Sequence, residues 1–427
     1  MYSSICDDLD IKPLTLYDLN RSSDSLDKIY LQLLQNHKSD LTPKYDLVLV
    51  DEAQDFYPSM FEVLFLLTKG DETSKRIVWA YDEFQSLKDL KIREPEDLFG
   101  TKISGEPNMP NTVLEGEYRG GIKKDFVLPN SYRNPRITLM VAHGVGLGLY
   151  TSDLKLPMRD RTSWIARGYE VKFPPKKQVF VKGDKLQIER PEKYSRNNLE
   201  TLLSENHKDD KKLIQLFEAD NSDEELIHVR DKIYSLVVNQ NVEPEEIIVI
   251  TLDNKNSEVE FASLRSMLNQ LSIKCTTPGY VESSDKFKEA GRVTLTTPFR
   301  AKGNEANIVF VIHCEKVIND YSGRARNSFF VSVTRSRGWC YLSCVGKGTS
   351  LKTEIDSIKL NYPQFVFTFP DRKQLEEREK VISTSDSKID QYESELNSRM
   401  KDEAYRALLL EKIANDPELL KEIQKKK

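Results

Sequence analysis

The chain has 427 residues with 63 Lys and Arg against 68 Asp and Glu, so its formal net charge is 63 − 68 = −5. With 38% hydrophobic residues and 18 each of Phe and Tyr, it is not disordered throughout, and its length predicts two to three domains. The acidic total argues against coating nucleic acid by bulk charge. It has no membrane-length apolar run, no signal-peptide pattern and five Cys without framework spacing, so we expect a cytoplasmic protein without a membrane partner.

The first 150 residues alternate between short apolar runs and amphipathic stretches. Tyr45–Glu52 is an apolar run that ends in carboxylates, residues 59–69 have a helical pattern, and Arg76–Asp82 is a second apolar run. Runs this apolar are typical of strands in a parallel sheet that helices cover on both faces. We therefore predict an α/β lobe over residues 1–150.

The pattern changes between residues 151 and 205. Residues 159–196 are polar, interrupted by proline and rich in β-formers, which predicts a small β-rich insert. Three of its residues, Trp164, Lys176 and Lys177, are candidates for stacking on bases and binding phosphates of a single strand. The alternative is an ordinary solvated hairpin.

The alternation resumes over residues 206–370, where apolar runs such as Glu246–Asp253 and Asn307–Cys314 are separated by helical patterns. Strand–helix alternation again predicts an α/β lobe. Residues 371–427 are charged and helical in pattern, which predicts a tail that docks on the body or on a partner. The five His show no metal-ligand spacing.

The first candidate site lies in LVLVDEAQDF, Leu47–Phe56. Two adjacent carboxylates, Asp51 and Glu52, follow a buried strand, and the carboxyl edge of a sheet is where α/β folds place their ligands. One carboxylate can hold Mg²⁺ through water while its neighbour polarises an attacking water. A solvated strand end is the alternative for a bare Asp-Glu pair.

The motifs that follow resemble, in order, those of the UvrD/Rep-like superfamily-one helicases. VDEAQD, which includes Gln54, resembles their Walker B motif. VWAYDEFQSL resembles the next motif, with Tyr81 in place of the usual Gly and Gln85 at the position that senses the terminal phosphate. LPNSYRNP resembles the N-Y-R motif, which puts Arg133 at a phosphate-contacting position.

Two further matches lie in the second lobe. VTLTTPFRAKGNEANIVFV resembles the T-x-H-x-x-K-G-x-E segment, with Phe299 in place of the His that couples to nucleic acid. NSFFVSVTRSRGW resembles the V-A-L-T-R-A motif, with Arg335 at the arginine-finger position. Both sequences resemble those of a bacterial branch of the family that is described as ATP-binding-domain or DEAD/DEAH-box helicases. The residues that match the T-x-H-x-x-K-G-x-E segment are Thr297, Lys302, Gly303 and Glu305.

The resemblance implies two RecA-like lobes of the P-loop NTPase type, ATP and Mg²⁺ as cofactors, and single-stranded DNA as a partner. Two arginines from different lobes would close over the nucleotide. The implied catalytic residues are Glu52, Gln85, Arg133 and Arg335. The implied cofactor-binding residues are Asp51, Gln54, Lys302, Gly303 and Glu305, with Asp51 and Glu52 at the metal and Thr297 and Phe299 at the nucleic acid.

The main departure from the family is the phosphate loop. G-x-x-x-x-G-K-[ST] does not occur in the sequence, and the segment before Tyr45 contains no glycine. We therefore interpret the chain as the C-terminal part of a helicase motor with an incomplete first lobe. A separate polypeptide would supply the Walker A segment and pair with the open sheet edge near residues 45–50. A truncated gene, a repacked lobe, or a non-hydrolysing interaction or nucleic-acid-binding module are the alternatives, and DNA versus RNA stays open.

Overall fold

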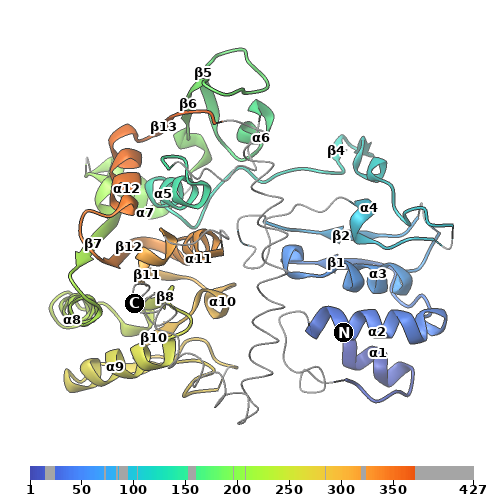
Figure 1. The fold of residues 1–427 in the computed structure, drawn as a ribbon, viewed down its shortest axis with the longest axis horizontal. Coiled ribbons are helices and arrows are strands. Elements are labelled where there is room, and N and C mark those ends of the chain that lie inside the picture. The colour runs from blue at the N-terminus through green and yellow to red at the C-terminus, as the bar shows by residue number, and fades with distance from the viewer. Residues whose placement is uncertain are drawn as a thin grey trace, which may run out of the picture. The chain divides into compact units, whose positions relative to one another are not determined.

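The computed structural model divides the chain into two units, Met1–Ile29 with Glu376–Lys427, and Tyr30–Leu375 (Figure 1). The described part of the first unit holds α1 (Tyr2–Asp8) and the start of α2 (Ser25–His37), and the second unit contains every predicted motif. The predicted helical tail, residues 371–427, lies outside the described residues. These are residues 1–14, 25–71, 74–82, 85, 95–102, 104–151, 160–195, 197–206, 208–283, 285–318 and 324–370.

The larger unit contains a six-stranded parallel sheet, which confirms the predicted α/β class and is the arrangement of a RecA-like lobe. Its central strand β8 reads IIVIT and is buried at every position, as expected for a strand covered on both faces. In order across the sheet, the strands are β7 (Ile214–Ala219), β12 (Ser336–Val345), β11 (Ala306–Ile312), β8 (Ile247–Thr251), β10 (Arg292–Thr296) and β9 (Lys274–Thr276).

Helices cover both faces of this sheet. Because alternate strand residues point to opposite faces, Ile247 joins the core beneath α8 (Ser222–Tyr234) and α9 (Ser257–Gln270), while Ile248 joins the core of the other face. That second core is formed with α5 (Arg136–Leu147), α11 (Arg324–Val333) and α12 (Ser350–Asn361). The shorter helices α7 (Asn198–Glu205) and α10 (Pro298–Ala301) complete this lobe.

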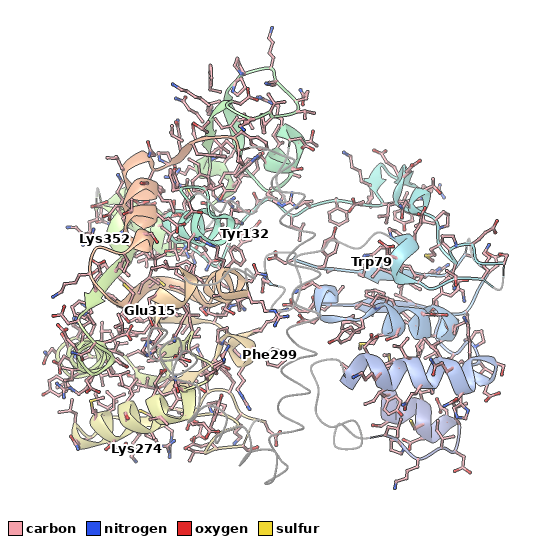
Figure 2. The ribbon with its side chains drawn as sticks, viewed as in Figure 1. Trp79, Tyr132, Lys274, Phe299, Glu315 and Lys352 are labelled. Carbon is pink, nitrogen blue, oxygen red and sulfur yellow. The ribbon has the colours of Figure 1, made fainter. Side chains whose placement is uncertain are left out.

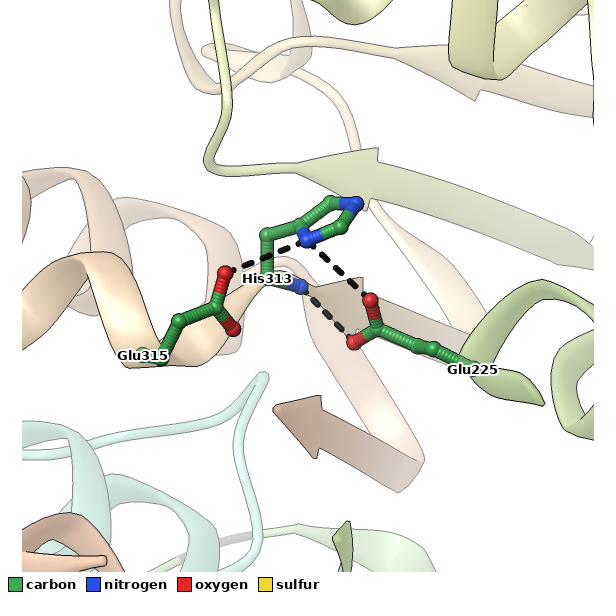
Figure 3. A group of neighbouring side chains, drawn as sticks. All are labelled: Glu225, His313 and Glu315. Atoms are coloured by element: carbon green, nitrogen blue, oxygen red, sulfur yellow. Dashed lines mark hydrogen bonds and ion pairs between the residues drawn. The ribbon is translucent and has the colours of Figure 1, made fainter. Parts of the chain in front are cut away.

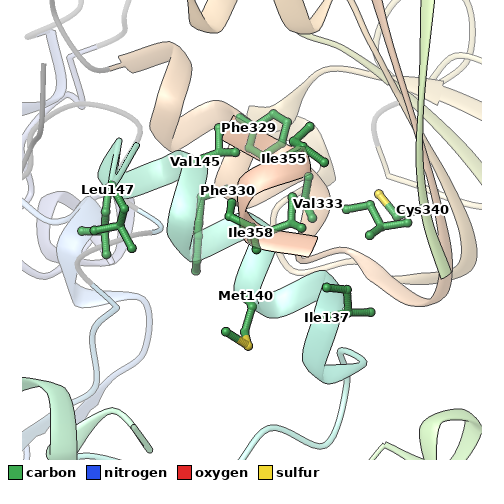
Figure 4. Packing of buried hydrophobic residues seen from close by; sticks show 14 of the residues in the cluster. Ile137, Met140, Val145, Leu147, Phe329, Phe330, Val333, Cys340, Ile355 and Ile358 are labelled. Atoms are coloured by element: carbon green, nitrogen blue, oxygen red, sulfur yellow. The ribbon is translucent and has the colours of Figure 1, made fainter. Parts of the chain in front are cut away.

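Helix α5 corrects the predicted domain boundary at residue 150. Ile137, Met140 and Val145 of this helix pack with residues of α11 and α12 in one core (Figure 4). A Cβ at Gly144 would lie 2.5 Å from Cδ1 of Ile358, so α5 and α12 approach closely at that point. The helix therefore belongs to the second lobe, although it precedes the insert in the sequence.

The predicted β-rich insert forms a sheet with a strand from the end of the second lobe. β5 (Glu170–Phe173) pairs with β6 (Lys185–Glu189), which pairs with β13 (Gln364–Thr368), all antiparallel. Trp164 of α6 (Arg161–Ala166) is fully buried against Tyr169, with ring centroids 5.4 Å apart. The prediction that Trp164 stacks on bases is therefore wrong, because its ring is core.

The first lobe is small in the described residues. β1 (Val48–Val50) and β2 (Ile77–Trp79) pair in parallel, and α3 (Pro58–Leu67) and α4 (Pro95–Leu98) contribute to the core on one face. On the other face the paired residues Leu49 and Val78 are 71% and 55% exposed. β3 (Glu117–Tyr118) and β4 (Ile122–Lys123) form a separate hairpin, and no described helix is long and apolar enough to cross a membrane.

Candidate nucleotide site

The backbone turns sharply where β1 ends. Glu52 has a φ of 51°, in the left-handed region that few residues other than glycine adopt. Its backbone N–H donates to Oδ1 of Asp51 at 2.9 Å, and the N–H of Ala53 donates to the carbonyl of Ala80 at 2.8 Å. The turn is therefore fixed from two sides, and it leaves the Asp51 carboxylate exposed at the carboxyl end of the strand.

A chain of hydrogen bonds joins the two predicted motifs of the first lobe. Nε2 of Gln54 donates to Oε2 of Glu52 at 2.5 Å, and Oε1 of Gln54 accepts the backbone N–H of Asp82 at 3.0 Å. Nε2 of Gln85 then donates to Oδ2 of Asp82 at 2.8 Å. Asp82 has no predicted role from the sequence. The signal was available, because Asp82 ends the second apolar run as Asp51 ends the first.

The chain of hydrogen bonds continues to Arg335, which is 1% exposed. Its Nη2 donates to Oε1 of Gln85 at 2.9 Å, and its Nε donates to the carbonyl of Val331 at 2.9 Å. Burial, reinforced by the nearby charge of Arg133, lowers the pKa of Arg335 to about 10. The guanidinium is therefore a buried charge whose hydrogen bonds to Val331 and Gln85 end on neutral oxygens, which favours an anion as a further ligand.

Lys302 brings a positive charge to the Walker B-like segment. Its Nζ lies 2.5 Å from Oδ2 of Asp55 and 3.3 Å from Oε2 of Glu52, and its side chain is 8% exposed. Gly303 follows with a φ of 82°, which glycine adopts without strain. Asp55 was missed by the sequence analysis, although it is the third acid of the VDEAQD string.

Arg133 lies with the second lobe. Its Nε donates to Oε2 of Glu305 at 2.5 Å, and the amide of the next residue, Asn134, donates to the carbonyls of Thr334 and Ser336 at 2.9 and 2.7 Å. The expectation that Arg133 and Arg335 come from different lobes is therefore wrong. The segment directly precedes α5, which packs on that lobe.

The nucleic-acid candidates do not join this group. Thr297 is buried and its carbonyl accepts the first backbone bond of α10, whereas Phe299 on that helix is 68% exposed (Figure 2). Lys176 is exposed after β5, and Nζ of Lys177 pairs with Asp184 at 2.7 Å. Their contact with a strand stays a prediction.

The implied cofactors fit part of this site. The exposed carboxylate of Asp51 is a suitable ligand for Mg²⁺ through water, and Gln85 and Arg335 present donors for phosphoryl oxygens. The carboxylate of Glu52 is engaged by Gln54 and Lys302. The residues that would cradle the other phosphates, a G-x-x-x-x-G-K-[ST] loop, do not occur in the sequence.

No protein-family model and no curated protein matches the chain. Among solved structures, it is similar to the C-terminal domain of a possible DNA helicase from Lactobacillus plantarum WCFS1, with 18% identity, a TM-score of 0.27, and coverage of 35% of this chain and 83% of that one. It is also similar to arterivirus nonstructural protein 10, a helicase in complex with DNA, with 12% identity and a TM-score of 0.23. That match covers 54% of each chain, so this chain spans about half the length of the viral protein.

Proposed function

We propose that this chain is the C-terminal part of a superfamily-one type helicase or translocase, which couples ATP hydrolysis to movement on single-stranded DNA. The observation that supports it is the chain of hydrogen bonds from Glu52 through Gln54, Asp82 and Gln85 to Arg335. It links the residue that would orient the attacking water to the guanidinium that would neutralise the transferred phosphoryl group. Because the link passes through side chains of separate segments, a change at the phosphate can alter all of them together.

In this proposal each residue has one task. Asp51 holds Mg²⁺ through water, and Glu52 orients the water that attacks the terminal phosphate. Gln85 contacts that phosphate, and Arg335 stabilises the charge of the transition state. A separate polypeptide supplies the phosphate loop, and the exposed apolar pair Leu49 and Val78 is a surface that such a partner would cover.

The test is complementation. The chain is co-expressed with a neighbouring polypeptide that carries G-x-x-x-x-G-K-[ST], the two are co-purified, and ATP turnover is measured with and without single-stranded DNA. We expect negligible turnover from the chain alone and DNA-stimulated turnover from the mixture, which Glu52→Gln abolishes. The matched control is Asp46→Asn, which should leave turnover unchanged because that exposed carboxylate near β1 pairs with Lys69 in a surface ion pair.

A second function is favoured by one contact. Because Lys302 already pairs with Glu52 and Asp55, its single positive charge partly compensates the two carboxylates without a metal or nucleotide, as a non-hydrolysing interaction module would need. Such a module would bind its partner or single-stranded DNA equally well in Glu52→Gln and with or without ATP. Turnover that depends on Glu52 would exclude it, and its absence in a stable two-chain complex would favour it.

A further inference from the structure

A second group of charged side chains lies away from the residues proposed to bind nucleotide. β11 ends at Ile312, and His313 follows it in the left-handed region with a φ of 58°. Glu315 lies in the short 3-10 helix Cys314–Val317, and Glu225 projects from α8 toward the same imidazole (Figure 3). The group is thus built at the carboxyl end of a central strand, which is where parallel sheets place their ligands.

The three side chains present one ligand atom each to a common point. Nδ1 of His313 lies 3.1 Å from Oε2 of Glu225 and 3.2 Å from Oε1 of Glu315, and the ligand atoms of all three residues lie within 4.8 Å of one another. Nδ1 carries one proton at most, so it cannot donate a full hydrogen bond to both carboxylate oxygens. Oε2 of Glu225 makes no geometrically good hydrogen bond among the described residues and contacts this same nitrogen in the ion pair, although the Glu225 side chain is fully buried. A buried carboxylate oxygen that shares its one close contact with a second carboxylate is under-coordinated, and a cation at this point would satisfy it.

The outward atoms of the same residues are held in place. Oε1 of Glu225 accepts the backbone N–H of His313 at 2.9 Å and the hydroxyl of Ser343 at 2.6 Å. Oε2 of Glu315 accepts the backbone N–H of Val345 at 3.0 Å. Each carboxylate is therefore oriented through one oxygen and offers the other to the centre of the group.

The other nitrogen of the imidazole lies close to a third carboxylate. Nε2 of His313 lies 3.1 Å from Oε1 of Glu260, and Oε2 of Glu260 accepts the hydroxyl of Thr251 at 2.7 Å. A histidine that binds a metal through one nitrogen commonly donates its other N–H to a carboxylate, which fixes the tautomer and raises the basicity of the ligand. Glu260 lies at the distance of such a bond, and a small rotation of the imidazole would align it.

We propose that Nδ1 of His313, Oε2 of Glu225 and Oε1 of Glu315 bind a divalent transition-metal ion, with Glu260 as the acceptor that orients the imidazole. Three carboxylates converge on one imidazole in this interior, and the neighbouring cation Lys316 pairs with Asp253 at 2.8 Å. A divalent ion compensates two of these three negative charges. One imidazole nitrogen with two carboxylate oxygens suits Zn²⁺ or Mn²⁺ better than Mg²⁺, which prefers an all-oxygen octahedron.

The site would tie α8 to the ends of β11 and β12, so its role is structural and it does not depend on the proposed ATP hydrolysis. The test uses the full chain after removal of metal by a chelator. Zn²⁺ is titrated in competition with a chromophoric chelator, and the thermal melt is recorded with and without the ion. We expect one Zn²⁺ per chain and a higher melting temperature in its presence.

Substitutions test which side chains bind the Zn²⁺ ion. His313→Asn and Glu315→Gln should each lower Zn²⁺ affinity at least tenfold and remove the rise in melting temperature, and Glu260→Gln should lower affinity about 10- to 100-fold. Glu315→Gln disturbs the core least, because the Glu315 side chain is partly exposed. Glu200→Gln is the matched control, since that buried glutamate pairs with Arg136 at 3.1 Å and should leave Zn²⁺ affinity unchanged.

The buried thiols need a separate control, because Cys314 is next to His313 and thiolates bind Zn²⁺. Its Sγ donates to the carbonyl of Val311 at 3.3 Å, so Cys314→Ala should leave Zn²⁺ affinity unchanged. No binding of Zn²⁺ to a folded chain would overturn the proposal and leave a buried ion-pair cluster. Binding that Cys314→Ala removes, or that both His313→Asn and Glu315→Gln retain, would overturn it as well.

Discussion

Two buried arginines on the second lobe should respond in opposite ways when their charge is removed. Arg326 donates to both oxygens of Glu354 at 3.0 Å, and its Nη1 also donates to the carbonyl of Val145. Arg335 is buried as deeply, but among the described residues no carboxylate forms an ion pair with it. We therefore compare Arg335→Met with Arg326→Met, in which an unbranched apolar side chain replaces each guanidinium.

The magnitudes follow from these contacts. Burial lowers the pKa of Arg335 to about 10, which corresponds to a cost of about 3 kcal/mol for keeping it charged, at about 1.4 kcal/mol per pH unit. Its bonds to Val331 and Gln85 return about 1 kcal/mol each. Arg335→Met should therefore leave the free energy of unfolding within about 1 kcal/mol of wild type, or raise it. Arg326→Met leaves Glu354 buried and unpaired, which costs about 3–5 kcal/mol.

The assay is urea unfolding followed by circular dichroism, with the unfolding slope compared between variants to check that each unfolds in one comparable transition. A loss of more than about 3 kcal/mol in Arg335→Met, equal to the loss in Arg326→Met, would refute the reasoning. It would mean that Arg335 stabilises the fold as an ordinary buried ion-pair residue. A neutral or stabilising outcome would mean that its charge is kept for an anion at a cost in stability.

Three further outcomes are expected. Arg265 lowers the pKa of Glu282 to about 2 through a hydrogen bond, so Glu282 contributes at most about 3 kcal/mol, present above about pH 4.5 and lost as the pH falls toward 2. In acid titrations, Glu282→Gln should reduce the dependence of the unfolding free energy on pH between about pH 4.5 and 2. An unchanged dependence on pH would contradict this. Gly144→Ala should lower the free energy of unfolding by about 1–3 kcal/mol, and with it the melting temperature, because the new methyl group would overpack against Ile358. Ile358→Val in the same chain should restore the lost stability, whereas additive losses from the two changes would exclude that contact. In the complemented mixture, Arg335→Ala should lower ATP turnover about 10³-fold and leave co-purification intact, whereas loss of the complex would point to a structural role.

The sequence predicted those parts of the fold in which local pattern and burial agree. The run IIVIT at residues 247–251 is apolar without interruption, and this is the composition that a doubly covered strand requires. The same reasoning assigned helix-forming sequence near residues 136–147 to the wrong lobe. A helical pattern identifies a buried helix, but it carries no information about which of two cores the helix joins. For the same reason, the sequence does not predict that β6 pairs with β13, which begins 175 residues after β6 ends.

In the candidate site, too, the residues that could be predicted are those that a local sequence pattern marks. Asp51, Glu52 and Gln85 were predicted as site residues because each follows an apolar run within a motif-like string. The contact of Gln85 with Arg335 depends on segments 250 residues apart, so no local pattern encodes it. The group around His313 was missed because Glu225 comes from α8 and only Glu315 is near in sequence. Trp164 was misassigned because an aromatic side chain among basic residues has the same sequence pattern in a hairpin core as on a binding surface.

The pairing of Lys302 is the feature on which the two proposed functions differ. Lys302 contacts two carboxylates, whereas Arg335 is bonded mainly to neutral oxygens. A nucleotide with Mg²⁺ would reverse this imbalance, because the metal competes with Lys302 for the carboxylates while the phosphate supplies an anion to Arg335. In a hydrolysing motor we therefore expect the Lys302 pairs to exchange during each cycle, so that loop 302–305 reports the nucleotide state to the second lobe. In a non-hydrolysing module the same pairs would persist in every state, and they would hold residues 51–55 against that loop permanently.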